Sequence, residues 1–224
     1  DELFYILTVP VIIIAVGYEY IFQFELPSEA VGETIGKYGI QGVFLAGYLF
    51  IVLLTTVISL AVFYRPRTFK WILLQVFRLP FLRKWRHDAS DTGDDIMITS
   101  KELKGKPFSF WFKSFASTVV SWTARFWVVN FLILAFVAVD DHLMIYARQL
   151  VMWVIMLISP TPGSTGIAEV AFSGFLREFI PIGLTGALAL LWRLVSYYPY
   201  LFIGAIILPR WIRRTHTSKK AKAE

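Results

Sequence analysis

Long apolar runs separated by short polar stretches dominate the sequence. Five of them lie at residues 3–18, 40–64, 114–139, 142–159 and 183–208, and a shorter sixth run lies at 167–178. An α-helix rises about 1.5 Å per residue, so about 20 apolar residues cross a hydrocarbon core of about 30 Å. The pattern therefore predicts roughly six membrane-inserted helices, of which the short one enters only part of the bilayer.

The composition favours an all-α polytopic transmembrane bundle with a broken or re-entrant helix pair. Apolar residues make up 57% of the chain, and the mean hydropathy is +0.62. One soluble core cannot bury that much apolar surface, so the surplus must face lipid. The chain has no cysteine, which excludes disulfides, thiol nucleophiles and thiolate metal sites.

The distribution of charge divides the chain into four segments. Residues 1–64 hold the first two transmembrane helices, and 65–113 form a basic cytoplasmic loop with an interfacial amphipathic helix. Residues 114–209 are the transmembrane core with its PTPGSTG break, and 210–224 are a basic cytoplasmic tail. Because the chain begins at Asp1 rather than at a methionine, we expect a fragment or a processed chain, and further helices before it are compatible with the sequence.

Basic residues indicate the orientation. Between Phe63 and Ser114 there are eleven basic residues and five acidic ones, and the tail is also basic. Acidic residues dominate residues 19–39 and the turn at Asp140 and Asp141. By the positive-inside rule, the sequence predicts a multi-pass plasma-membrane protein with a cytoplasmic C-terminus. The net charge of +6 then points to anionic membrane lipids as partners, and not to nucleic acid.

Apolar and basic positions alternate at helical spacing over residues 67–85, with a break near Pro80. This pattern predicts a basic amphipathic helix in the membrane interface, chiefly an anchor for the loop and alternatively a site that captures a specific lipid. Residues 87–95 are rich in Asp, Ser, Thr and Gly, and we expect a solvated linker there.

The segment Ser159 to Glu169 cannot continue a helix. Its breaking residues are Pro160, Pro162, Gly163 and Gly166. If it lies at membrane depth, protein or a wet cavity must shelter its backbone, and the following helix N-terminus could hold an anion. The alternative is a simple turn between two spans at the cytoplasmic interface.

Ionisable residues inside apolar runs are candidate functional residues, because each costs roughly 2.5 to 3.5 kcal/mol at the bilayer centre. Arg125 and Arg193 lie near the middle of their runs, and Glu169 follows the break. At helical spacing, Tyr197 and Tyr200 fall on the face of Arg193. Arg148 and Arg177 lie nearer to helix ends, where we expect them to snorkel.

Two interpretations of these residues stay open. In the first, Arg125 and Arg193 accept a lipid phosphate in a polar groove, while Glu169 engages a cationic group or balances the arginines and Tyr197 contributes to the binding site. In the second, Glu169 pairs with an arginine and only holds the bundle together. No metal-ligand spacing and no catalytic constellation is visible, so we expect no metal, no cofactor and, more likely than not, no enzymatic activity.

Around this break the sequence resembles the lysylphosphatidylglycerol synthase transmembrane-region family, also called flippase-like domain proteins. Members carry a proline, then PGG and a following G..E, at the end of a membrane helix. The corresponding positions here are Pro160, Pro162, Gly163, Ser164, Gly166 and Glu169. The family's arginine and aromatic cluster in the last span is matched by Trp192, Arg193, Tyr197, Tyr198 and Pro199.

The resemblance covers residues 100–210 and implies re-entrant helices around a central cavity and a link to charged lipids. Ser164 departs from the pattern, because the family has a second glycine there. Synthase members add a soluble aminoacyltransferase domain, which these residues do not contain, so that activity is not transferred.

The expected function is therefore to bind or translocate a charged lipid or lipid-linked headgroup. Two alternatives remain: the membrane region of a lipid-modifying aminoacyl- or glycosyl-transferase system, and a structural assembly protein. A homo-oligomer or a separate transferase partner is compatible with each.

Overall fold

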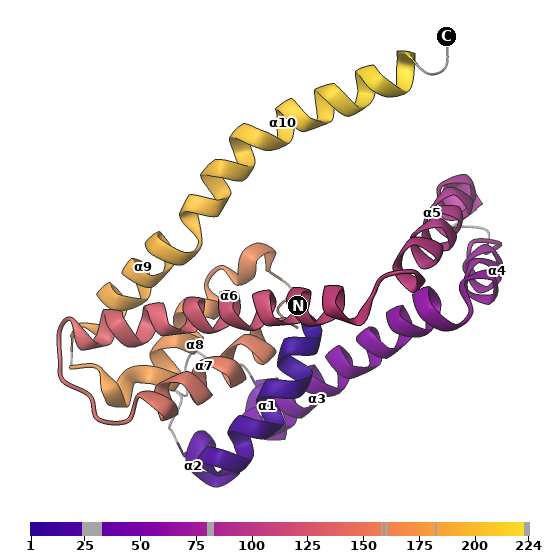
Figure 1. Cartoon of the computed structure of the whole chain (residues 1–224). Helices are drawn as coiled ribbons and strands as arrows, with labels where there is room; N and C mark the ends of the chain where they lie inside the picture. The colour runs from indigo at the N-terminus through magenta and orange to yellow at the C-terminus, as the bar shows by residue number, and fades with distance from the viewer. Residues whose placement is uncertain (24–32, 80–82, 158, 160, 182, 222–224) are drawn as a thin grey trace. The chain divides into compact units, whose positions relative to one another are not determined.

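The computed structural model describes residues 1–23, 33–79, 83–157, 159, 161–181 and 183–221. Within these residues the backbone forms helices and connecting turns and no strand (Figure 1). The predicted all-α membrane fold is confirmed. Each apolar run contains an α-helix, as expected because a backbone in lipid must satisfy its own hydrogen bonds within the segment.

The helices follow the apolar runs closely. They are α1 (Glu2–Val16), α3 (Glu33–Ser59), α6 (Phe108–Leu134), α7 (His142–Leu157), α8 (Ile167–Leu176), α9 (Thr185–Ser196) and α10 (Tyr198–Ala221). Three stretches are long and apolar enough to cross a membrane, at Gly39–Tyr64, Phe108–Leu134 and Thr185–Pro209. Helices α1 and α7 are apolar but shorter, and α8 has only 10 residues, too few to cross the bilayer.

The last apolar run is broken where the sequence pattern suggested one continuous helix. Helix α9 ends at Ser196, and Tyr197 has φ −120° and ψ −53° before α10 begins. Pro199 gives the physical reason, because it has no N–H to donate to the carbonyl of Val195. The Tyr197 amide still bonds to the Arg193 carbonyl at 2.9 Å, so the chain continues in nearly the same direction.

The chain divides into two compact units. Unit 1 comprises residues 1–11 and 38–121, and unit 2 comprises residues 12–37 and 122–224. In unit 1, α4 (Pro66–Val76) packs beside α5 (Arg86–Lys104), as Figure 1 shows. The Lys70 ammonium bonds to the Asp94 carboxylate at 2.6 Å across this pair. A helix within the predicted amphipathic stretch 67–85 is thus confirmed for α4.

The prediction of a solvated linker at residues 87–95 is wrong, because these residues lie in α5. Local bonds favour the helix: His87 pairs with Asp91 one turn away at 3.2 Å. Packing adds to this, since a Cβ at Gly93 would lie 2.6 Å from Cγ of Lys70, so only glycine allows so close an approach of α4. Composition alone suggested a linker, and tertiary contact outweighed it.

The core of unit 2 is centred on α7, which packs against α8, while α8 also packs against α9 (Figure 1). An aromatic cluster joins α6 to α7: the Phe126 ring lies 5.4 Å from Tyr146 and 6.3 Å from Trp153, in edge-to-face geometry. Such pairs hold two apolar helices in a defined register.

A buried amide pair adds a polar contact between α6 and α7. Asn130 and Gln149 are each 1% exposed. The Gln149 side-chain amide donates to the Asn130 carbonyl oxygen at 3.0 Å, and Asn130 donates to the His142 carbonyl at 3.0 Å. Between membrane helices, such side-chain bonds act as polar links that apolar packing alone does not supply.

Replacing Asn130 with leucine should destabilise unit 2, because it removes the acceptor of the Gln149 amide. We expect a loss of about 0.6 to 1.7 kcal/mol, the range measured for hydrogen bonds between membrane helices. Thermal unfolding in detergent measures it, and Gln149→Leu, which removes the donor of the same bond, should lower the stability to a similar extent. An unchanged melting temperature in Asn130→Leu would show that the pair contributes nothing.

Candidate functional site

The backbone conformation of the residues between α7 and α8 explains why the helix breaks there. A short 3-10 turn spans Pro162–Ser164, and the backbone takes positive φ at Gly163 (64°), Ser164 (53°) and Gly166 (84°). Ser164 is thus left-handed, although its side chain disfavours this conformation. Its hydroxyl donates to the Met156 carbonyl at 3.1 Å, a bond back to α7 that stabilises the turn. The family's usual glycine at this position would adopt the same φ without strain.

Gly163 is required by a close neighbour as well as by its φ. A Cβ built there would overlap the Tyr197 hydroxyl and would lie 2.8 Å from the ring carbon Cζ. Gly163 therefore allows the tyrosine at the α9–α10 junction to lie directly against the break. The glycine and Tyr197, selected separately from the sequence, belong to one site.

Glu169 is held by the same backbone. It is the third residue of α8, and its Oε2 accepts the Gly166 amide at 2.7 Å. This bond satisfies one of the free N–H groups at the helix start and places a carboxylate near the positive end of the helix dipole. The other oxygen, Oε1, accepts from Nε of Arg193 at 3.0 Å.

Arg193 bonds to Glu169 and also to the backbone of the break. Its Nη2 donates to the carbonyl oxygens of Gly163 and Ser164, each at 3.1 Å. Its guanidinium also lies 5.0 Å from the centre of the Tyr197 ring. The residue is only 7% exposed, so its charge is compensated by Glu169 and by the break carbonyls. We name Gly163, Ser164, Glu169, Arg193 and Tyr197 the break cluster.

The two side chains of the ion pair differ in their exposure to solvent. The Arg193 side chain is 8% exposed, whereas the Glu169 side chain is 38% exposed. A direct Glu169–Arg193 pair, one of the two interpretations left open by the sequence, is therefore present. The exposed carboxylate edge is the part of the cluster that a ligand could approach.

Arg125 lies outside the break cluster. Its guanidinium lies 5.0 Å from the ring centre of Trp122 and 5.0 Å from that of Tyr200, and the side chain is exposed. Within the described part of the chain it forms no ion pair. Helical spacing placed Tyr200 on the face of Arg193, but the break at Tyr197 turns it toward Arg125 instead.

Pro160 lies outside the described residues, as does the Pro162 side chain. The predicted sites thus fall into two groups that share the residues around the α9–α10 junction. Glu169, Arg193, Tyr197, Gly163 and Gly166 come together, and Arg125 reaches the same junction through Tyr200.

Arg148 was missed by reasoning from the sequence. It was expected to snorkel, but it is 3% exposed. Its Nη1 donates to Glu178 at 2.8 Å and to the Phe175 carbonyl at 3.1 Å, and its Nη2 donates to the Gln23 carbonyl at 3.0 Å. These partners are distant in sequence, so no local signal could have identified them. The expectation for Arg148 is wrong, because acceptors from three other segments of the chain lie within reach of its guanidinium.

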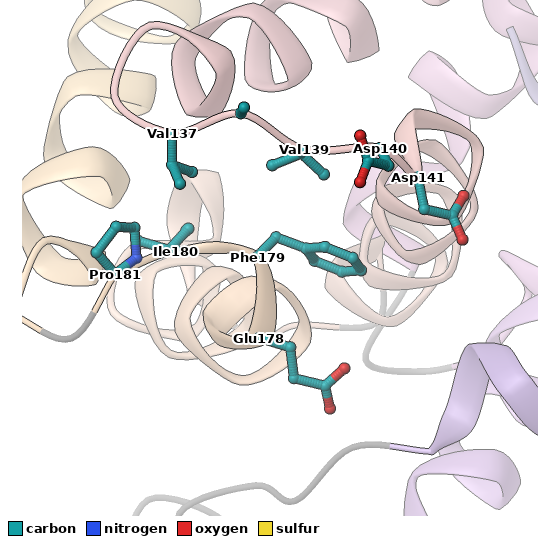
Figure 2. A pocket seen from close by; sticks show the side chains of 9 residues that line it. Val137, Val139, Asp140, Asp141, Glu178, Phe179, Ile180 and Pro181 are labelled. Atoms are coloured by element: carbon teal, nitrogen blue, oxygen red, sulfur yellow. The ribbon is translucent and has the colours of Figure 1, made fainter.

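A pocket of about 510 Å³ lies where the α6–α7 loop faces the residues after α8. Figure 2 shows Asp140 and Asp141 at one end of it and Val137, Ile180 and Pro181 toward the other. Asp141 accepts the Met144 amide at 2.9 Å at the start of α7, and Glu178 pairs with Arg148. Two of its three carboxylates therefore hold the fold, and the break cluster remains the stronger candidate site.

Comparison with known proteins identifies the family. The model of the lysylphosphatidylglycerol synthase transmembrane region matches residues 2–204. The chain belongs to this family. The resemblance first seen at residues 100–210 is confirmed and extends toward the N-terminus.

A curated relative is also a membrane protein. A UPF0104 membrane protein of Archaeoglobus fulgidus is 37% identical over 89 residues, which is 40% of this chain and 27% of that protein. The match thus spans about a quarter of the relative's length. No solved structure matches the chain. Together with the apolar helices, these matches show that the chain is an integral membrane protein of the lysylphosphatidylglycerol synthase transmembrane-region family.

The geometry of the break predicts that alanine is tolerated less well at Gly163 than at Gly183. Gly163→Ala should cost about 1–2 kcal/mol for the positive φ and about 1–3 kcal/mol more for the overlap with Tyr197. Gly183→Ala is the matched control, because Gly183 has φ 91° but nothing lies within 4 Å of its Cβ position. Thermal unfolding in detergent compares the two, and equal losses would mean that the contact with Tyr197 has no energetic weight.

Proposed function

We propose that this membrane protein binds a charged lipid or lipid-linked headgroup and translocates it, with a phosphate engaged by Arg125. The observation that carries the proposal is the position of this cation. Arg125 lies inside the candidate span Phe108–Leu134, is exposed, and has no carboxylate partner among the described residues. The phosphate of a lipid that crosses the membrane is an anion whose oxygens match the paired N–H donors of a guanidinium.

The energetics favour a bound anion. A lone arginine near the bilayer centre costs roughly 2.5 to 3.5 kcal/mol on insertion scales. The Trp122 and Tyr200 rings recover part of this by cation–π attraction, worth about 0.5–2 kcal/mol. An aromatic ring offers no acceptor oxygen, and Arg125 donates no hydrogen bond to a described residue, so its N–H groups remain available to two oxygens of a phosphate.

The break cluster would serve the headgroup. Tyr197 and Tyr200, three residues apart in the chain, contact Arg193 and Arg125 respectively. A ligand phosphate at Arg125 would therefore place its headgroup along this tyrosine strip, toward the exposed edge of Glu169. A cationic group on the lipid would find a carboxylate there, and an uncharged one would find tyrosine hydroxyls.

Membrane orientation follows the same reasoning. The basic residues of 65–113 and of the tail favour a cytoplasmic position for both segments in a plasma membrane, by the positive-inside rule. Anionic lipids are the partners of this proposal, and a homo-oligomer or a separate transferase partner is compatible with it.

A second candidate function is structural, and the closed ion pair favours it. Glu169 and Arg193 contact directly at 3.0 Å, and Arg193 also bonds to two carbonyls of the break. These contacts connect α8, α9 and the 3-10 turn without any ligand. In this case the pair stabilises the re-entrant geometry, and Arg125 alone contacts lipid.

Arg125→Gln tests the first proposal. We expect about tenfold less retained anionic lipid, and a similarly reduced rate of lipid transfer in liposomes, because one charge-assisted phosphate contact is worth about 1.5–3 kcal/mol. Native mass spectrometry and a fluorescent phosphatidylglycerol assay measure these quantities. Arg177→Gln, an exposed arginine of the same unit, is the matched control. Normal lipid retention and transfer in Arg125→Gln would refute the proposal.

A double-mutant cycle tests the structural role of the pair. Glu169→Gln and Arg193→Gln should each lower the unfolding free energy, and the double variant should lose less than the sum of the two. The expected coupling is about 0.5–3 kcal/mol, as for contacting residues of one network. Unfolding in detergent measures it. Purely additive losses would show that the two side chains do not stabilise the fold as a pair.

A further inference from the structure

The turn between α4 and α5 brings three arginines around one hollow. Arg78 follows α4, Arg83 lies in a 3-10 turn spanning Arg83–Trp85, and Arg86 begins α5. All three are exposed and line a hollow of about 280 Å³ within unit 1. We call it the arginine hollow. It shares no residue with the break cluster or with Arg125, so it is independent of the function proposed above.

The charges of the arginine hollow are not compensated by the described protein. Arg78 donates to the neutral Gln75 side chain at 3.0 Å, and none of the three arginines forms an ion pair with a described carboxylate. Of the four aspartates in the first turns of α5, Asp91 pairs with His87 and Asp94 with Lys70, while Asp88 and Asp95 form no ion pair with a described residue. Three like charges that face one hollow repel each other unless an anion enters, so they create a local positive potential.

The ligand chemistry follows from donor type and size. Guanidinium groups bind phosphate oxygens with paired N–H donors, and three positive charges attract a doubly charged phosphate more strongly than a singly charged one. A volume of 280 Å³ is just below the usual range of about 300–1,000 Å³ for organic ligands. The hollow therefore suits a compact anion better than a large organic molecule.

The surroundings place this anion close to a membrane. Large apolar side chains on the same hairpin are exposed, among them Trp71 (61%), Leu79 (50%) and Trp85 (48%). The positive end of the α5 helix dipole lies next to Arg86, where Asp88 in the first turn offsets part of it. A tryptophan-rich surface beside basic residues is typical of a helix that lies in the headgroup region.

We infer that the arginine hollow binds the phosphate group of a phosphomonoester, carried by a membrane lipid or free in solution. The solvated-loop alternative predicts that these arginines act only as unspecific charges. The two interpretations predict different effects of substitutions on ligand affinity. If the hollow is a binding site, the affinity depends on Arg78, Arg83 and Arg86 in particular; if the arginines act only through their charge, it depends on the number of charges removed.

The test uses the full chain in neutral detergent with short-chain phosphatidic acid, short-chain phosphatidylcholine and inorganic phosphate, titrated by calorimetry. The variant is Arg78→Gln, Arg83→Gln and Arg86→Gln combined. The matched control is Lys101→Gln, Lys104→Gln and Lys106→Gln combined, which removes the same charge from exposed positions of unit 1 outside the hollow.

We expect the Kd for phosphatidic acid to rise by about tenfold or more in the arginine variant and to stay within about twofold in the lysine variant. Competition by inorganic phosphate at similar concentration would identify a soluble source, and its failure to compete would identify the lipid. The inference is overturned if both variants weaken binding equally, or if the unmodified chain binds phosphatidic acid no better than phosphatidylcholine. Arg83→Gln alone, with an expected rise of about threefold or more, serves if the triple variant is unstable.

Discussion

The unit that holds the predicted site depends on how Arg193 compensates a broken helix. A break in a helix leaves carbonyls and amides without partners, and each such group that is buried costs free energy. Arg193 donates to the carbonyls of Gly163 and Ser164, while Glu169 accepts the Gly166 amide and balances the arginine charge. One ion pair therefore provides hydrogen-bond partners for backbone groups at both ends of the break.

This arrangement leaves Arg125 in a different situation from Arg193. Arg193 is buried and donates to three protein oxygens, whereas Arg125 is exposed and, among the described residues, its charged group contacts the rings of Trp122 and Tyr200. Two arginines that look alike in the sequence thus carry different roles: one completes the fold, and the other retains free donors. This contrast is the physical basis for assigning the phosphate to Arg125 and the stabilising role to the Glu169–Arg193 pair.

The same distinction between satisfied and unsatisfied groups applies across the chain. Arg148 donates to Glu178 and to two carbonyls inside unit 2, and Asn130 and Gln149 satisfy each other between α6 and α7. The arginines of the hollow in unit 1 have no such acceptors among the described residues beyond Gln75. Groups that the protein leaves without counter-charge are the ones that a membrane ligand can engage.

The sequence by itself determined the helical membrane fold, the position of each apolar helix and the break at Gly163 to Gly166. These features depend on local quantities: the length of an apolar run, the φ preference of glycine and the missing N–H of proline. It also indicated, in one of two interpretations, that Glu169 pairs with an arginine, and the structure identifies that arginine as Arg193. Only the tertiary structure decided that Arg148 is buried, that Tyr200 contacts Arg125, and that residues 87–95 are helical. Each of these depends on a neighbour far away in the chain, or on packing against another helix, and no local pattern encodes which acceptor or ring will lie within reach.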